Sequence, residues 1–206
     1  MTTRRLDAAD PTAIAAAAEL LRRGLPVVLP TDTVYGVGVL PFDAAAIDRL
    51  YAIKGRPAEK GIPILLGDVA DVAYVAGLIP PAAAALMAHF WPGPLTLIVP
   101  RRPELPANLS PDDTIAVRVP DHAVARALIR AAGGAVAATS ANVSGQPPAC
   151  AADEALAALG GRVAAVLDDG PSPGGVASTV VDCTVDPPVV RRAGPLTAAD
   201  LGLEAS

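Results

Sequence analysis

The sequence has few of the residues on which covalent or metal-dependent catalysis usually relies. It contains two histidines, His89 and His122, and two cysteines, Cys150 and Cys183. No H-E-x-x-H, C-x-x-C or other zinc-binding spacing occurs, and neither a G-x-S-x-G elbow nor a Walker loop is present. Two isolated cysteines build no disulfide framework, so we interpret them as free thiols in a reducing compartment. The inventory favours substrate positioning and charge neutralisation over covalent catalysis.

Long apolar runs are also lacking. A long apolar stretch without a charged residue, residues 72–88, is interrupted by one glycine and two prolines, which favours two helices over a membrane span. The first eleven residues contain two arginines and two aspartates but no apolar segment, so no signal peptide is expected. Aromatic residues make up only 3% of the chain, so small aliphatic residues must build the core. We expect a cytoplasmic protein with one domain over residues 1–206 and a core at about 10–194.

Positive charge is scarce and unevenly distributed. The net charge of −5 argues against a general surface for polyanions such as RNA. Only two lysines accompany fourteen arginines, and both lie in KGRPAEK, where Lys54 and Lys60 flank Arg56. A charge run is usually a solvated face. Here a glycine and a proline restrict the loop and an apolar run follows at once, so we expect the three cations to bind a small anion such as phosphate.

Apolar patterns predict alternating helices and strands. His122 is expected to start a helix, and the first helix to begin with Asp10 as N-cap and Pro11 at its first position. Predicted helices cover about 11–23, 43–53, 68–76, 80–90, 122–132 and 151–159. Predicted strands cover 26–30, 62–66, 95–100, 115–120, 135–139, 163–167, 178–184 and 189–194. Short connections near 95–120 and 178–192 leave little room for crossover helices. This predicts an α/β fold with a twisted, open, mixed sheet flanked by helices.

Two polar loops follow predicted strands, where open α/β sheets usually bind ligands. The first, residues 31–38, carries two threonine hydroxyls, the Asp32 carboxylate and the Tyr35 phenol, and its two glycines leave room for a ligand. The second, SANVSGQPP, offers the hydroxyl of Ser140, the amide of Asn142 and a glycine. Each loop alone is equally consistent with an ordinary turn or a capping segment.

Arginines in two apolar strands are further candidates. Arg118 lies within IAVRVP, and a half-buried arginine needs an anionic partner, either a ligand or a nearby aspartate. Arg191 and Arg192 end the last strand, where alternation turns only one of them inward. Between these strands, residues 170–179 are rich in glycine and proline and form either a lid over a pocket or a long surface loop.

Seven segments together resemble the YrdC/Sua5 family in order and spacing. They are PTDTVYGVG, KGRPAEKGIPILL, WPGPLTLIV, VRVPDH, TSANVSGQPP, ASTVVD and RRAG, and the match runs from about Pro30 to Gly194. The resemblance implies a YrdC-like fold and L-threonylcarbamoyladenylate synthase activity. In that reaction L-threonine, bicarbonate and ATP, the last with Mg²⁺, yield threonylcarbamoyl-AMP and pyrophosphate for the t6A modification of tRNA.

The resemblance also implies roles for particular residues. The K-x-R motif of the family falls on Lys54 and Arg56, and its S-x-N motif on Ser140 and Asn142, as the catalytic set. The residues implied to face ATP are Lys54, Arg56, Lys60, Thr114, Ser140 and Arg192. Those implied to hold threonine are Thr33, Arg118 and Ser178, and no protein ligand to a metal is implied.

The chain departs from the family pattern in two places, and other functions compete. Ala177 stands where many relatives have Glu or Pro, and Ala193 where Pro is usual, so either Arg191 or Arg192 could face ATP. The chain resembles short family members, which implies separate proteins that transfer the threonylcarbamoyl group to tRNA. The acidic net charge leads us to expect weak or no direct tRNA binding. The alternatives are a non-catalytic RNA-binding module, which the acidic charge disfavours, and a carbamoyl-handling domain as in hydrogenase maturation proteins, whose additional segments are missing.

Overall fold

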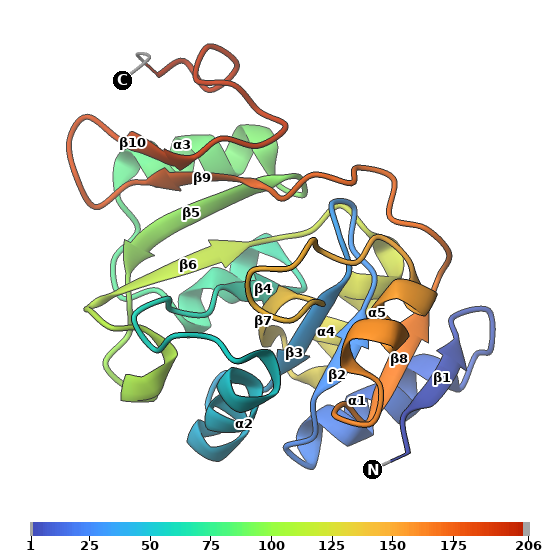
Figure 1. Cartoon of the computed structure of the whole chain (residues 1–206). Helices are drawn as coiled ribbons and strands as arrows, with labels where there is room; N and C mark the ends of the chain where they lie inside the picture. Colours follow the sequence, from blue (N-terminus) through green and yellow to red (C-terminus); the bar gives the residue numbers. More distant parts are fainter. Residues whose placement is uncertain (1, 204–206) are drawn as a thin grey trace.

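Ten strands form one twisted sheet with helices on both faces (Figure 1). The computed structural model describes residues 2–203. The strands are β1 (Arg4–Asp7), β2 (Val27–Leu29), β3 (Gly36–Val39), β4 (Ile64–Leu66), β5 (Leu95–Pro100), β6 (Thr114–Arg118), β7 (Ala135–Ser140), β8 (Ala165–Asp168), β9 (Thr179–Asp182) and β10 (Val189–Arg192). The helices are α1 (Ala13–Arg22), α2 (Ala44–Lys54), α3 (Pro81–Phe90), α4 (Ala123–Ala132) and α5 (Ala152–Leu159), with short 3₁₀ helices η1 (Val69–Tyr74) and η2 (Ala107–Leu109).

The sheet is mixed, as the short connections predicted. Its order is β1-β8-β2-β3-β7-β4-β6-β5-β9-β10. The neighbouring pairs β5/β6 and β9/β10, each joined by a connection without an α-helix, are antiparallel. The pairs β1/β8, β2/β8, β4/β6 and β5/β9 are parallel. The predicted α/β class with an open mixed sheet is confirmed.

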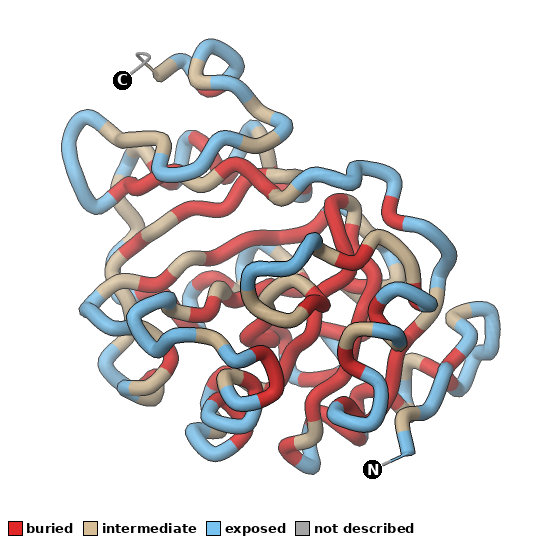
Figure 2. The backbone as a smooth tube through the Cα atoms, in the orientation of Figure 1, coloured by how far each residue is buried: buried red, intermediate tan, exposed pale blue. Residues whose placement is uncertain are grey.

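Two apolar clusters sandwich the sheet, and the buried strands between them form the red centre of Figure 2. Helices α2, α3 and α5 contribute to the larger cluster, while α1 and α4 contribute to the other. Alternation along the strands divides residues between the faces, so that Val28 joins the first cluster and Val27 and Leu29 join the second. Small residues allow this close packing, since Ala17, Ala18 and other helical alanines are fully buried.

The same alternation places two polar side chains on the face of the sheet that α1 and α4 cover. In β5 and β6, Leu97 and Val117 point into the larger cluster, so Thr96 and Arg118 point to the opposite face. On that face α1 contacts β1, β2 and β8, while α4 contacts β4 and β7. Thr96 and Arg118 instead line a cavity.

The N-terminal region differs from the prediction in two ways. Residues Arg4–Asp7 form β1, which pairs with β8 at the edge of the sheet and was not predicted. Helix α1 begins later than expected, because the Asp10 carboxylate accepts hydrogen bonds from the backbone N–H and the hydroxyl of Thr12, both at 2.8 Å. This closes a turn before the helix starts, and Thr12 occupies the N-cap position.

A second correction concerns residues 31–38, predicted to be a loop throughout. Their second half belongs to β3, which pairs antiparallel to β2 and to β7. At Gly38 a Cβ atom would lie 2.5 Å from Cγ1 of Val136, so this glycine permits contact between strands rather than ligand approach. The segment predicted as a helix at 68–76 is the shorter 3₁₀ helix η1. His122 caps α4 as predicted, with its ring accepting from the N–H of Ala125. Among residues 2–203, no helix is long and apolar enough to cross a membrane.

Candidate active site

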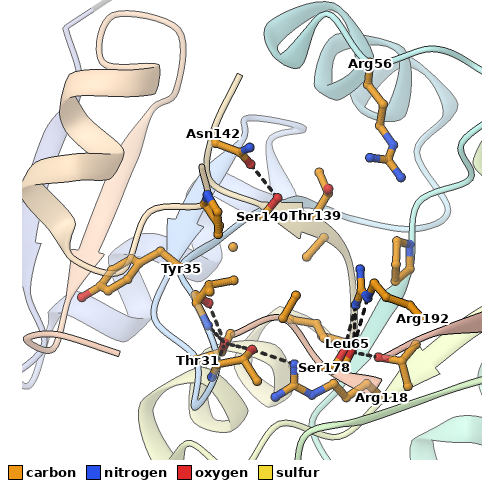
Figure 3. A pocket seen from close by; sticks show the side chains of 18 of the residues that line it. Thr31, Tyr35, Arg56, Leu65, Arg118, Thr139, Ser140, Asn142, Ser178 and Arg192 are labelled. Carbon is orange, nitrogen blue, oxygen red and sulfur yellow. Dashed lines mark hydrogen bonds between the residues drawn. The ribbon is translucent and has the colours of Figure 1, made fainter. Parts of the chain in front are cut away.

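A cavity of about 330 Å³ opens between the two polar loops and the strands β5 and β6 (Figure 3). Its apolar wall includes Pro63, Leu65, Ala138 and Pro148. Its polar lining consists of Thr31, Thr33, Arg56, Thr96, Arg118, Thr139, Ser140, Asn142, Gln146, Ser178 and Arg192. Seven residues singled out from the sequence are therefore brought together from segments far apart in the chain: Thr33, Arg56, Arg118, Ser140, Asn142, Ser178 and Arg192.

Arg118 is held in a buried ion pair at the floor of the cavity. Its Nη2 lies 2.5 Å from Oδ1 of Asp32, its Nη1 donates to the Thr33 hydroxyl at 2.9 Å, and its Nε donates to the Gly93 carbonyl at 2.9 Å. Burial lowers the pKa of the Arg118 guanidinium, and the Asp32 carboxylate opposes that shift. The aspartate partner considered from the sequence is thus present. Three of the five guanidinium N–H groups are engaged here, which leaves two for a ligand.

Arg56 and Arg192 point into the same opening and make no ion pair with any carboxylate among residues 2–203 (Figure 3). Arg56 donates to the backbone carbonyls of Lys60 and Gly61, both at 2.8 Å. Arg192 donates to the backbone carbonyl of Ser178 at 2.8 Å. Desolvation lowers the pKa of both arginines, and the charge of Arg56 lowers the pKa of Arg192 further. Two guanidinium charges without a carboxylate partner give this opening a positive charge that suits an anionic ligand.

The structure decides between the two arginines of the last strand. Arg191 forms an ion pair with Asp182 at 2.7 Å, outside the cavity, whereas Arg192 lines the cavity. Strand alternation did not settle this choice, because β10 has an irregular register between Val190 and Arg192.

Lys54 is buried beside the S-x-N turn. Its side chain is only 1% exposed and lies outside the cavity lining, so the expected contact of this lysine with the triphosphate stays a prediction. Its Nζ donates to the carbonyls of Ser140 and Asn142, each at 2.6 Å, and to Oδ1 of Asn142 at 3.1 Å. Burial, and then the charge of Arg56, lowers the pKa of Lys54 to about 8, so at neutral pH it retains the proton that these acceptors require. Lys54 thus stabilises the S-x-N turn through hydrogen bonds to Ser140 and Asn142.

The S-x-N turn is closed by its own side chains. Oγ of Ser140 donates to Oδ1 of Asn142 at 2.5 Å, and Nδ2 of Asn142 donates to the Gln146 carbonyl at 2.5 Å. With Lys54 attached to the same Oδ1, the Asn142 amide has a fixed orientation. The Ser140 hydroxyl is thereby held at the cavity wall.

Two other predicted nucleotide ligands lie outside the cavity. Lys60 is exposed, and its backbone carbonyl rather than its ammonium group contacts Arg56. Thr114 begins β6, at the opposite end from Arg118, and its hydroxyl donates to Asp112 at 2.6 Å. Contact of either residue with a nucleotide stays a prediction.

The glycine-rich segment 170–177 packs against the first polar loop. The Tyr35 phenol points away from the cavity and donates to the Gly170 carbonyl at 2.6 Å, and burial raises its pKa to about 12 (Figure 3). The N–H of Gly174 donates to the Asp32 carbonyl at 3.0 Å. A Cβ at position 174 would lie 2.6 Å from that carbonyl oxygen, so only glycine fits there.

Several cavity residues escaped the sequence analysis, namely Thr96, Thr139 and Gln146. A signal was available for Thr96, because it is the one hydroxyl-bearing residue in the strand LTLIVP and alternates with Leu95 and Leu97. Thr139 and Gln146 belong to a segment already expected to bind a ligand, and only the folded loop shows which of its side chains reach the cavity.

The site offers little for a metal ion held by protein side chains alone. Among residues 2–203, no three His, Cys, Asp or Glu side chains gather into a possible metal site. The carboxylate next to the cavity, that of Asp32, is engaged by Arg118. Such a donor set fits Mg²⁺ only as an ion that arrives on the phosphates of a nucleotide.

The fold and this cavity define an α/β protein with an arginine-lined cavity beside its strand ends. The model of the Sua5/YciO/YrdC family, described as "Telomere recombination", matches residues 19–194, and the chain belongs to this family.

Individual relatives agree with the family assignment. The threonylcarbamoyl-AMP synthase of Bacillus subtilis is 42% identical over 197 residues, which cover 95% of this chain and 57% of that protein. The crystal structure of Pyrococcus abyssi Sua5 in complex with L-threonine superposes with a TM-score of 0.91 at 35% identity, over 98% of this chain and 60% of that one. Escherichia coli YciO superposes with a TM-score of 0.86 at 28% identity, over 98% of this chain and all of that one. The chain thus spans somewhat over half the length of the first two relatives.

Proposed function

We propose that this protein is a threonylcarbamoyl-AMP synthase, which converts L-threonine, bicarbonate and ATP into threonylcarbamoyl-AMP and pyrophosphate. The observation that carries the proposal is the division of charge within one cavity. Arg56 and Arg192 leave positive charge for a polyphosphate, while Arg118 is nearly neutralised by Asp32 and presents directed N–H groups. The related protein from Bacillus subtilis has this activity in its name, and the related Sua5 structure contains L-threonine.

The amino acid is assigned to the Arg118 side of the cavity. Two free N–H groups of Arg118 match the two oxygens of a carboxylate. The hydroxyls of Thr33 and Ser178 complete the set of polar groups around that position. Orientation of the amino acid directs its amine toward bicarbonate. The amine nitrogen forms a bond to the bicarbonate carbon, one C–O bond breaks and water leaves, and the resulting carbamate supplies the attacking oxygen.

The nucleotide is assigned to the Arg56 and Arg192 side. The carbamate oxygen forms a bond to the α-phosphorus while the bond to the bridging oxygen of pyrophosphate breaks, and the leaving group carries the negative charge away. Arg56 and Arg192 stabilise that charge, and the Ser140 hydroxyl turns its proton from Oδ1 of Asn142 to a phosphate oxygen when the nucleotide binds. No side chain acts as a nucleophile. Mg²⁺ bound with ATP supplies further neutralisation of phosphate charge.

The finer assignments follow from this reaction. The product is a reactive mixed anhydride, so separate tRNA threonylcarbamoyl-transferase proteins are proposed to consume it, with weak or no direct tRNA binding by this chain. The net charge of −5 supports weak tRNA binding by this chain, because binding to nucleic acid depends on positive charge. We propose that the reaction takes place in the cytoplasm, where ATP and tRNA are available.

Pyrophosphate release by the purified protein tests the proposal. The assay contains ATP, Mg²⁺, L-threonine and bicarbonate, and one component is omitted at a time. We expect release that requires both L-threonine and bicarbonate. Release that needs neither would indicate a plain ATPase, and absence of release together with tight, salt-sensitive RNA binding would support the RNA-binding alternative instead.

A further inference from the structure

Thr96 is a buried cavity residue to which the proposed mechanism gives no role. It is 4% exposed and lines the cavity from β5, a strand whose other residues are apolar. Its Oγ1 lies 2.7 Å from Oγ of Ser178, which is also 4% exposed. A lone hydroxyl in an apolar strand carries a desolvation cost that a valine of the same shape would avoid.

The backbone around this hydroxyl pair is fixed. Strands β5 and β9 run parallel, and the N–H of Thr179 donates to the Pro94 carbonyl at 3.0 Å. Ser178 precedes β9 directly, so its position relative to Thr96 is set by the sheet. Arg192 secures it from the other side, with Nη2 at 2.8 Å from the Ser178 carbonyl and at 3.2 Å from its Oγ.

The direction of these hydrogen bonds limits what the Ser178 hydroxyl can do. Arginine only donates, so Arg192 occupies one lone pair of the Ser178 oxygen. Either oxygen of the Thr96–Ser178 pair can be the donor. When Thr96 donates, both lone pairs of the Ser178 oxygen are filled, and the Ser178 proton is left to point to a third acceptor. Both residues line the cavity, where an oxygen of a bound ligand can serve as that acceptor.

We propose that Thr96 is a positioning residue that turns the Ser178 hydroxyl into a hydrogen-bond donor for the oxygen atoms of the bound amino acid. The inference rests on the proposed function and deepens it. Because Arg192 is the second group on Ser178, the chain Thr96–Ser178–Arg192 joins the amino-acid side of the cavity to the polyphosphate side.

The test compares Thr96→Val, which keeps the shape and removes the hydroxyl, with Thr96→Ser, which retains the hydroxyl. Calorimetric titration with L-threonine gives affinity directly, and steady-state pyrophosphate release gives KM for each substrate. We expect Thr96→Val to weaken threonine binding and raise its KM by roughly tenfold, with a change in KM for ATP of less than about twofold. Thr96→Ser should restore values near those of the wild type. Circular dichroism and the thermal midpoint verify that both variants are folded.

A double-mutant cycle with Ser178→Ala makes the test specific. If Thr96 acts through Ser178, Thr96→Val should cost little further affinity once the Ser178 hydroxyl is gone. Unchanged threonine binding in Thr96→Val, additive losses in the cycle, or failure of serine to rescue would each overturn the inference. A wild-type protein that binds L-threonine but releases no pyrophosphate would contradict the proposed function alone, since titration still tests Thr96. A wild-type protein that does not bind L-threonine would overturn both.

Discussion

Two groups of arginines in this protein meet opposite electrostatic conditions. On the surface near η1, Arg126 and Arg130 both bind the Asp68 carboxylate, at 2.9 and 2.5 Å. In the cavity, Arg56 and Arg192 donate hydrogen bonds to backbone carbonyls, and their two positive charges repel each other. The first group is satisfied within the fold and stabilises a local structure, since Asp68 also caps η1. The second group has no carboxylate partner among residues 2–203, a condition that favours binding of an anionic ligand.

The largest effects should come from the cavity group itself. We expect Arg56→Ala and Ser140→Ala each to lower the rate of pyrophosphate release by about a hundredfold or more. Each substitution removes a hydrogen-bond donor to the charge that develops on the phosphate. The fold should remain intact, since both side chains line an open cavity. Activity assays with thermal melts check this, and near-normal turnover in either variant would refute that residue's assignment.

Adjacent residues of β10 provide a matched comparison for the next effect. Arg192→Gln should raise KM for ATP and lower kcat/KM by roughly tenfold, because a charge-assisted contact to the polyphosphate is lost. Arg191→Gln removes the same charge from a side chain that pairs with Asp182 outside the cavity. Its kcat/KM should therefore stay within about twofold of the wild type. Steady-state kinetics for ATP measures both. Equal losses in the two variants would mean that overall charge, not the position of Arg192, governs binding.

Lys54 represents a third condition, a buried cation bonded to carbonyl oxygens. Lys54→Met should lower the free energy of unfolding by about 2 kcal/mol, because the Asn142 carbonyl loses its charged donor and the Ser140 carbonyl and Oδ1 of Asn142 each lose one of their donors. Turnover should also fall, since the S-x-N turn loses its support. Urea unfolding measures the first effect. If Lys54 acts only through this turn, adding Lys54→Met to Ser140→Ala should not further weaken binding of ATP, whereas a direct phosphate ligand would show an additional loss.

The smallest effect should come from the satisfied surface group. Hydrogen bonds from Arg130 and Arg126 hold the pKa of Asp68 below its ordinary value, so the folded state releases its proton more readily than the unfolded chain. The resulting stability is present above the ordinary aspartate pKa, about 4, and is lost as the pH falls through the lower folded-state value. Asp68→Asn should therefore be less stable than the wild type at neutral pH, and the difference should shrink in acid. Urea midpoints across that range measure it, and activity at neutral pH should be unchanged.

Local sequence patterns were sufficient for much of the fold. Glycine, proline and apolar periodicity located five helices and most strands, because these residues act through local backbone geometry and through which face is buried. Strand β1 was missed because its polar sequence RRLD has only one buried side chain. Strand β3 was missed because glycines alternate with its valines, and only packing against Val136 explains Gly38.

The sequence by itself determined the α/β class, the burial of Arg118 and the concentration of cations and hydroxyls in a few loops, because each depends on residue type and local spacing. Only the tertiary structure decided that Lys54 points inward, that Arg192 rather than Arg191 enters the cavity, and that Thr96 meets Ser178. Those outcomes depend on strand order, on register, and on contacts between residues more than eighty positions apart. Pairings of that kind arise only when the whole sheet assembles, because no local preference encodes which strands become neighbours.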